Sequence, residues 1–409
     1  MILSEIISEP YNSRVYLERY VNDGSPSGFT TRHTTNINTS PFELNPYFNP
    51  FICYAPTQCF KDYGHIPQIN NSDNWIIIHP DMIQNSFFLN KEFSLKSFDS
   101  KVVPTASGRT LQFINDFNND YVKLHYVGIL GRIRRELPYF KAIAGVELSQ
   151  LLSTAIEQKL LDNKIAILPE IGARVLINRE MQNYEWGMVW RQNMPFGLDT
   201  ENYIYLFPSF SLFSQDRLNN NHFPILKQII DNYNFVPEEY VLEVIIFPLI
   251  RCYFNLIQTL GLQPELNSQN LLIAFNKDFS DCLFVLRDLE SIDKDLTMME
   301  SIGLSFISNS YPYKCIEKEQ YNYTIKHSFM YDFKLGESIL EPIVNLLCQY
   351  YNSDRQQIQT KIRNYANSFI KKLPFNFFPQ NKWYSFAKVL IDQTKKERPY
   401  IENSNLKFR

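Results

Sequence analysis

Two short apolar runs on either side of a polar turn constrain the fold of this chain more than any other feature. The runs are Leu271–Phe275 and Cys282–Leu286, and the segment between them, Asn276–Asp281, is polar. This pattern predicts a β-hairpin whose loop is longer than the tightest turns. In an antiparallel hairpin the start of one strand lies beside the end of the other, roughly 5 Å away. Residues just before the first run are therefore expected to meet residues just after the second.

Polar residues occupy both of those positions. Glu265, Asn267 and Asn270 precede the first run, and Arg287 and Asp288 follow the second. An amide oxygen and a carboxylate that converge at a strand end form a hard-oxygen site, suited to a Mg²⁺ ion that carries the phosphates of a nucleotide. The alternative is that the polar cluster caps the hairpin and that Arg287 and Asp288 form a surface ion pair. The pattern alone leaves both interpretations open, because short motifs have many false positives.

Charge and cysteine usage argue against several partners and locations. The chain has 40 basic and 43 acidic residues and no long basic block, so nucleic acid is not expected as a partner. Its six cysteines show no CxxC spacing, and the N-terminus lacks the basic region and apolar core of a signal peptide. No apolar run reaches the roughly 18–20 residues that span a bilayer. A reduced, soluble, cytoplasmic protein with no membrane partner is expected.

The order of the expected elements predicts an α+β protein with a strand-rich N-terminal half and a helix-rich C-terminal half. Residues 1–70 are rich in turn formers and aromatic residues and are expected to form ordered loops. Strands are expected at Trp75–His79, within Val102–Phe113, in the first part of Tyr121–Pro138, at Ile165–Ile177 and at Trp186–Trp190. Helices are expected at Phe140–Lys159, Phe223–Tyr233, Val236–Leu260, Leu335–Tyr351, Asp354–Lys372 and Trp383–Lys396. Pro248 should bend or break its helix, and Gly261 should cap the end of that helix.

A second candidate site is the segment Pro104–Thr110, with the sequence PTASGRT. Its hydroxyls (Thr105, Ser107 and Thr110), its backbone amides and Arg109 can bind phosphate oxygens. Cations follow closely at Lys123, Arg132, Arg134 and Arg135. The alternatives are an ordinary turn and a solvated basic face. Together with Asn270 and Asp288, these residues supply all the parts of a site for ATP and Mg²⁺.

Other nucleotide and catalytic motifs are missing from the sequence. It contains no GxxxxGK[ST], GxGxxG or GxSxG, and its histidines lack zinc-ligand spacing. His79, at a strand end before Pro80, is interpreted as structural rather than catalytic.

The ordered set of motifs resembles the NRPS-independent siderophore synthetases of the aerobactin (IucA/IucC) type. The resemblance rests on His79–Pro80, Pro104–Thr110, Lys123 followed twelve residues later by Arg135, Gly261–Leu272 and Leu286–Ile292. Weaker similarities lie at Gly24–Pro26 and at Glu170 with Trp186–Arg191. The match runs in the family's order from about residue 20 to the end of the chain.

The resemblance implies a fold, a reaction and site residues. It implies a fingers-like domain over residues 1–160, with the phosphate-binding turn, and a palm-like domain over 161–409, with the hairpin. It implies a ligase that uses ATP to adenylate a small carboxylic acid, such as a citrate-like one, and passes the acyl group to an amine or alcohol. Related enzymes are often dimers, so a homodimer is compatible with it. The implied roles are catalysis by Lys123, Arg135 and Asn267, nucleotide binding by Thr105, Ser107, Arg109, Thr110, Asn270 and Arg287, and Mg²⁺ binding by Asn270, Asp288 and Glu265.

The sequence also departs from the family pattern. Asn267 stands where the family has a histidine, and asparagine cannot carry a proton or a positive charge. The family's HPWQ reads HPDM here, and the chain begins where an N-terminal thumb region would end, so that region is expected to be missing. Two alternatives stay open, and only the second follows from these departures. One is a small-molecule kinase, and the other is a catalytically inactive relative that serves as a partner or scaffold.

Overall fold

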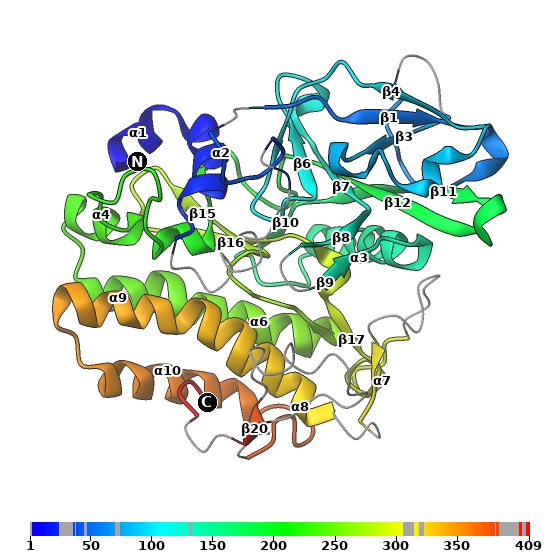
Figure 1. Cartoon of the computed structure of the whole chain (residues 1–409). Helices are drawn as coiled ribbons and strands as arrows, with labels where there is room; N and C mark the ends of the chain where they lie inside the picture. Colours follow the sequence, from blue (N-terminus) through cyan, green and yellow to red (C-terminus); the bar gives the residue numbers. More distant parts are fainter. Residues whose placement is uncertain are drawn as a thin grey trace.

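A four-stranded and a six-stranded sheet form the centre of the molecule, and a layer of helices covers one side (Figure 1). A computed structural model describes residues 2–23, 36, 38–44, 47–69, 74–130, 133–305, 315–318, 323–380, 382–383, 401–402 and 406–409. The expected α+β class is confirmed, with most strands in the first half of the chain and long helices in the second. Gly24–Pro26, Arg132 and residues 384–396 of an expected helix lie outside the described residues, while Trp383 lies in a strand.

The N-terminal part carries most of the strands. They are β1 (Phe51–Tyr54), β2 (Phe60–Gly64), β3 (Trp75–Ile78), β4 (Ser94–Ser97), β5 (Val102–Pro104), β6 (Thr110–Phe113), β7 (Tyr121–Leu124), β8 (Tyr126–Leu130), β9 (Ile133–Arg135), β10 (Ile165–Ile167), β11 (Glu170–Asn178), β12 (Tyr184–Arg191) and β13 (Tyr203–Pro208). Three helices lie among them: α1 (Leu3–Ser8), α2 (Pro10–Tyr20) and α3 (Tyr139–Glu157). The expectation of loops throughout residues 1–70 is wrong for α1, α2, β1 and β2, because contacts with distant segments stabilise these elements.

The C-terminal part is mostly helical. Its helices are α4 (Ile225–Asn232), α5 (Pro237–Tyr240), η8 (Val241–Ile246), α6 (Phe247–Leu260), α7 (Leu296–Ser301), α8 (Tyr323–Ser328), η10 (Phe329–Leu340), α9 (Glu341–Tyr351) and α10 (Arg355–Ile370). Its strands are β14 (Leu262–Gln263), β15 (Leu271–Asn276), β16 (Cys282–Leu286), β17 (Asp293–Asp295), β18 (Cys315–Ile316), β19 (Lys382–Trp383) and β20 (Ile401–Glu402). Short 3-10 turns link several elements: η2 (Thr57–Cys59), η3 (Pro80–Met82), η4 (Ser86–Leu89), η5 (Phe117–Asn119), η6 (Arg179–Met181), η7 (Ser209–Leu212) and η9 (Leu289–Ser291).

The predicted hairpin is confirmed as β15 and β16, which pair antiparallel with Leu271 opposite Leu286. They are the two central strands of the sheet β10–β16–β15–β13. Side chains alternate between its two faces: Ile273 and Phe275 join the large core shared with the helices, whereas Leu272 and Ala274 join a small core on the opposite face. Burial on both faces explains why these runs are almost wholly apolar.

The six-stranded sheet, β2–β11–β12–β7–β6–β5, is antiparallel throughout. One face packs against the small sheet β3–β1–β4 through a core that contains Trp75, Trp186 and Trp190. Helix α3 covers the other face. The sheet takes β11 and β12 from beyond residue 160, so the division of the chain at that residue into fingers-like and palm-like domains stays a proposal.

Proline does not interrupt the long helix as expected. The helix runs from Pro237 to Leu260, and a π-helical segment, η8, lies directly before Pro248. The wider π turn changes the hydrogen-bond register, which accommodates a residue that lacks an N–H group. The expected cap at Gly261 is confirmed, because this residue has φ +62°.

This helix also corrects the expectation that no stretch is long and apolar enough for a membrane. By length and composition, Pro237–Leu260 passes that test. However, 67% of its most apolar window is buried inside the protein, as in the core helix of a soluble protein.

Candidate active site

The hairpin brings the two predicted polar clusters together at one end. The backbone N–H of Arg287 donates to the carbonyl oxygen of Asn270 at 3.0 Å, so the pairing of the strands continues to these residues. Asp288 follows with φ +59°, a left-handed conformation that asparagine and aspartate adopt more readily than other non-glycine residues. Such a residue at a strand end is often part of a functional site.

Six charged side chains of alternating sign meet around Asp288, and we call them the ion cluster. In order along their ion pairs they are Arg109, Glu290, Lys123, Asp288, Arg191 and Glu170. Lys123 Nζ lies 2.9 Å from Glu290 Oε1 and 3.2 Å from Asp288 Oδ1. The cluster joins β7, β11 and β12 of the six-stranded sheet, and the turn before β6, to the end of the hairpin.

Burial makes these charges interact strongly. Burial by itself would raise the pKa of Asp288, but Lys123, Arg191 and Arg287 outweigh that effect and hold the pKa well below its usual range. The pKa of Glu290 is lowered in the same way, because Lys123 and Arg109 outweigh its burial. Both carboxylates are therefore ionised at neutral pH, and each can accept cations or hydrogen bonds.

Helix α3 leaves room for this cluster by placing a glycine against it. A Cβ atom at Gly145 would collide with Oε2 of Glu170. Glu170 Oε1 in turn lies 2.6 Å from Arg191 Nη2, which also contacts Asp288. Any side chain at Gly145 would therefore displace the carboxylate that orients Arg191.

Arg135 is placed beside the ion cluster by the short strand β9. Its backbone oxygen accepts a hydrogen bond from Arg109 Nη1 at 2.8 Å. Burial and the neighbouring Arg109 lower the pKa of Arg135 to about 10, against the opposing effect of Asp288, Glu265 and Glu290. Arg135 stays positively charged at neutral pH and lies where several carboxylates act on it.

The predicted phosphate-binding turn forms as expected, but its hydroxyls bind within the turn. Ser107 Oγ accepts the N–H of Thr110 at 3.1 Å and lies 3.1 Å from Thr105 Oγ1. The N–H of Ala106 donates to Glu18 Oε1 at 3.2 Å. These bonds fix the shape of the turn and place Arg109 in the ion cluster.

Glu18 of α2 links this turn to the hairpin. Its two carboxylate oxygens accept hydrogen bonds from the two terminal nitrogens of Arg287, at 2.9 and 3.0 Å. Arg287 Nε also donates to the carbonyl oxygen of Gln269 at 2.6 Å. Arg287 therefore lies in a buried bidentate ion pair rather than on the surface, which favours the site over the simple surface pair.

Asn267 holds the loop before the hairpin. Its Oδ1 accepts the N–H groups of Gln269 and Asn270, each at 2.9 Å, and its Nδ2 donates to Glu265 Oε1 at 3.3 Å. Glu265 also pairs with Lys334 of η10. Asn267 thus has a clear structural role at the position where the family has a histidine.

The donor set suits a hard divalent cation. Asp288 makes both of its ion pairs through Oδ1, and Asn270 donates to Ser291 through Nδ2, so Asp288 Oδ2 and Asn270 Oδ1 take no part in these contacts. Mg²⁺ commonly takes one or two carboxylates and fills its other positions with water and phosphate oxygens. Among the described residues, no three His, Cys, Asp or Glu side chains form a complete protein-only site. The residues present therefore fit a Mg²⁺ ion bound together with a nucleotide.

The structure adds residues that were not predicted as part of the site. Glu18 lies in an unexpected helix and gave no sequence signal. Glu170 and Arg191 belong to a segment noted only as a weak similarity, and Glu290 lies two positions after Asp288. His79 is wholly buried with a pKa lowered to about 4 by burial, and its Nδ1 accepts the N–H of Asp81, in line with a structural role.

Comparisons with known proteins give a family match for one segment and a shared fold. Residues 79–211 match the IucA / IucC family. No curated protein sequence matches significantly.

Three solved structures illustrate the shared fold. The petrobactin biosynthesis protein AsbB from Bacillus anthracis str. Sterne superposes with a TM-score of 0.69 and 12% identity, over 95% of this chain and 74% of that one. The ATP-bound aerobactin synthetase IucA from a hypervirulent pathotype of Klebsiella pneumoniae superposes with a TM-score of 0.69 and 13% identity. The match covers 98% of this chain and 80% of that one. Aerobactin synthetase IucC from a hypervirulent pathotype of Klebsiella pneumoniae has a TM-score of 0.61 and 14% identity. That match covers 82% of this chain and 66% of the other. The family segment and the shared fold confirm the resemblance of this chain to the NRPS-independent siderophore synthetases of the IucA / IucC type.

Proposed function

We propose that this protein is an ATP-dependent ligase that adenylates a small carboxylic acid and transfers the acyl group to an amine or alcohol, as in siderophore or related natural-product biosynthesis. The ion cluster is the main support, because it unites Arg109, Lys123 and Asp288 from segments that are far apart in sequence. The ATP-bound IucA structure supports ATP as the co-substrate.

The proposed reaction has two steps. A carboxylate oxygen of the acid attacks the α-phosphorus of ATP, the bond to the bridging oxygen of the β-phosphate breaks, and pyrophosphate leaves. The amine or alcohol then attacks the acyl carbon, AMP leaves with the bonding electron pair, and the nucleophile loses a proton. Neither step needs a covalent bond to the protein, so positioning and charge neutralisation are the tasks of the site.

Each predicted residue except Asn267 has a role in that scheme. Arg109 and the amides of the turn Thr105–Thr110 would bind the phosphates, with Arg287 supporting the turn through Glu18. Lys123 and Arg135 would stabilise the negative charge that develops at the α-phosphate. Asn270 and Asp288, with Glu265 nearby, would hold Mg²⁺, which supplies positive charge to the phosphate oxygens.

A pyrophosphate-release assay tests the proposal. It uses Mg-ATP, hydroxylamine as a general nucleophile, and citrate, 2-oxoglutarate, succinate and amino acids as candidate acids. Acid-dependent pyrophosphate, AMP and a hydroxamate product would support the ligase and identify the acid. ADP as the product would indicate a kinase instead.

The structural role of Asn267 favours one second candidate, an inactive relative that binds ATP as a partner or scaffold. No turnover with any acid, together with intact ATP binding, would support that candidate. We expect a cytoplasmic protein, and a homodimer remains a prediction that analytical ultracentrifugation can test.

A further inference from the structure

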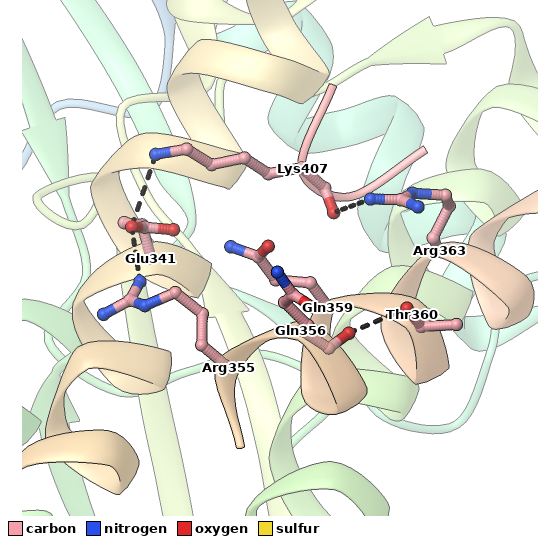
Figure 2. Close-up of a pocket in the computed structure, with 7 residues that line it drawn as sticks. All are labelled: Glu341, Arg355, Gln356, Gln359, Thr360, Arg363 and Lys407. Carbon is pink, nitrogen blue, oxygen red and sulfur yellow. Dashed lines mark hydrogen bonds and ion pairs between the residues drawn. The ribbon is translucent and has the colours of Figure 1, made fainter. Parts of the chain in front are cut away.

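A polar cavity lies apart from the ion cluster, between α9, α10 and the last residues of the chain. Its volume is about 480 Å³, which is within the usual range for small-molecule sites. Figure 2 shows the side chains that line it: Glu341, Arg355, Gln356, Gln359, Thr360, Arg363 and Lys407. None of these residues belongs to the ion cluster or to the hairpin.

The C-terminal residues form a fixed wall of this cavity. Phe408 is buried in the large core, and its carbonyl oxygen accepts a hydrogen bond from Tyr331 at 3.1 Å. Arg363 Nη2 donates to the carbonyl oxygens of Leu406 and Lys407, at 3.2 and 3.4 Å. The cavity is therefore a built feature and not a gap beside a loose tail.

The lining has more positive than negative charge. Glu341 Oε1 lies 2.8 Å from Arg355 Nη1 and 3.3 Å from Lys407 Nζ, so one carboxylate oxygen serves two cations. Arg363 is a third cation, which makes three positive groups for one negative group. An anion is the ligand that this surplus favours.

Two buried polar atoms of the lining have no hydrogen-bond partner within the described part of the chain. They are Arg363 Nε, a donor, and Glu341 Oε2, an acceptor. Buried polar atoms are nearly always paired, so each of these lacks the partner that such an atom normally has. The partner of Glu341 Oε2 must donate a hydrogen bond, and a neutral donor suits it because Arg355 and Lys407 repel an ammonium group.

We propose that this cavity binds a small hydroxylated dianion. Its negative groups would face Arg363, Arg355 and Lys407, and its hydroxyl would donate to Glu341 Oε2. The two negative charges could belong to a hydroxylated dicarboxylate or to a hydroxylated phosphate ester. This site is separate from the one where ATP and the acid are proposed to react.

Calorimetric titration of the full chain tests the proposal. The probes are malate, succinate as the same dicarboxylate without a hydroxyl, and glycerol 3-phosphate as the phosphate form. Malate or glycerol 3-phosphate should bind, and the tighter of the two shows whether the ligand is a dicarboxylate or a phosphate ester. If it is a dicarboxylate, succinate should bind at least ten-fold more weakly than malate. Binding of neither hydroxylated probe would overturn the proposal, and succinate binding as tight as malate binding would overturn the role of Glu341 Oε2.

Two variants locate the binding. Gln359→Glu adds a negative charge inside the cavity and leaves the bonds of Arg363 to the tail in place, so it should weaken binding at least ten-fold. Lys361→Gln changes the net charge equally on the same helix, but Lys361 pairs with Glu238 outside the cavity, so binding should not change. Equal weakening by both variants, or none by Gln359→Glu, would place the probe elsewhere and overturn the proposal. Asp288→Asn should leave binding intact, which separates this test from that of the active site.

Discussion

Lys123 Nζ lies 3.2 Å from Asp288 Oδ1, although 165 positions separate the two residues. One is on an inner strand of the six-stranded sheet and the other follows the hairpin of the four-stranded sheet. The proposed site therefore depends on how these two sheets pack, and four predictions follow from its contacts and from those of the helical layer.

Asp288→Asn should reduce acid-dependent pyrophosphate release by at least about 10²-fold, because it removes a charge that is proposed to hold Mg²⁺. The fold should survive, since asparagine tolerates the left-handed conformation, Lys123 keeps Glu290 and Arg191 keeps Glu170. Asp281→Asn, at the other end of the same hairpin, is the matched control and should retain activity. Unchanged turnover in Asp288→Asn would remove the hairpin end from the mechanism.

Arg135→Gln should also lower adenylation by about 10²-fold, the usual effect of deleting one transition-state contact. The bond from Arg109 to residue 135 uses the backbone oxygen, so the substitution leaves it available. Arg251→Gln, which alters a distant arginine paired with Asp162, serves as control. A loss of thermal stability without any loss of turnover would show that Arg135 is structural.

Asn267→His tests the departure from the family pattern. An imidazole can carry the positive charge that asparagine lacks, so we expect faster pyrophosphate release. It can accept only one of the two N–H groups that Asn267 Oδ1 now accepts, so a small fall in unfolding temperature is also expected. Asn267→Ala should lower the unfolding temperature without making pyrophosphate release faster. Slower turnover in the histidine variant would mean that Asn267 is adapted to this protein's own substrate.

Glu337→Gln should change how stability depends on pH. Burial, with Glu341 and Asp332 nearby, raises the pKa of Glu337 to about 7 in spite of Lys407. The folded protein therefore binds this proton more tightly than the unfolded chain does. The contribution of Glu337 to the free energy of unfolding is fully present below about pH 4.5 and is lost as pH rises through about 7. Unfolding temperatures of the variant and wild type should diverge between pH 5 and pH 8, with the variant higher at pH 8. Glu300→Gln on the exposed face of α7 should show no such divergence. If Glu337→Gln shifted the unfolding temperature equally at pH 5 and pH 8, the raised pKa of Glu337 would be contradicted.

Sequence patterns were informative where local chemistry decides the structure. The hairpin, the strand Trp75–Ile78, helix α3 and the Gly261 cap all follow from periodicity, burial on both faces or backbone conformation. The helices of residues 3–20 did not follow from such local patterns, because Glu18 has its partner in Arg287, 269 positions away. The continuity of the helix through Pro248 depends on a π turn that no composition rule signals.

Some residues of the proposed site could likewise be predicted from the sequence, and others could not. Motif order and spacing predicted Arg109, Lys123, Asn270 and Asp288 as site residues, and their role stays a prediction. The carboxylates that pair with the cations were harder to find, since Glu18 and Glu170 are near the cluster only in the folded chain. The role of Asn267 as a loop cap could not be deduced from its residue type, because capping depends on the direction of its side chain.

The alternation of sign in the ion cluster has a consequence for how a nucleotide would arrive. Three cations and three carboxylates neutralise one another, so the cluster projects little long-range field into solution. ATP would not be drawn in by a patch of surplus positive charge. It would instead compete with the protein's own carboxylates at short range, so recognition would be an exchange of partners whose rate responds weakly to ionic strength.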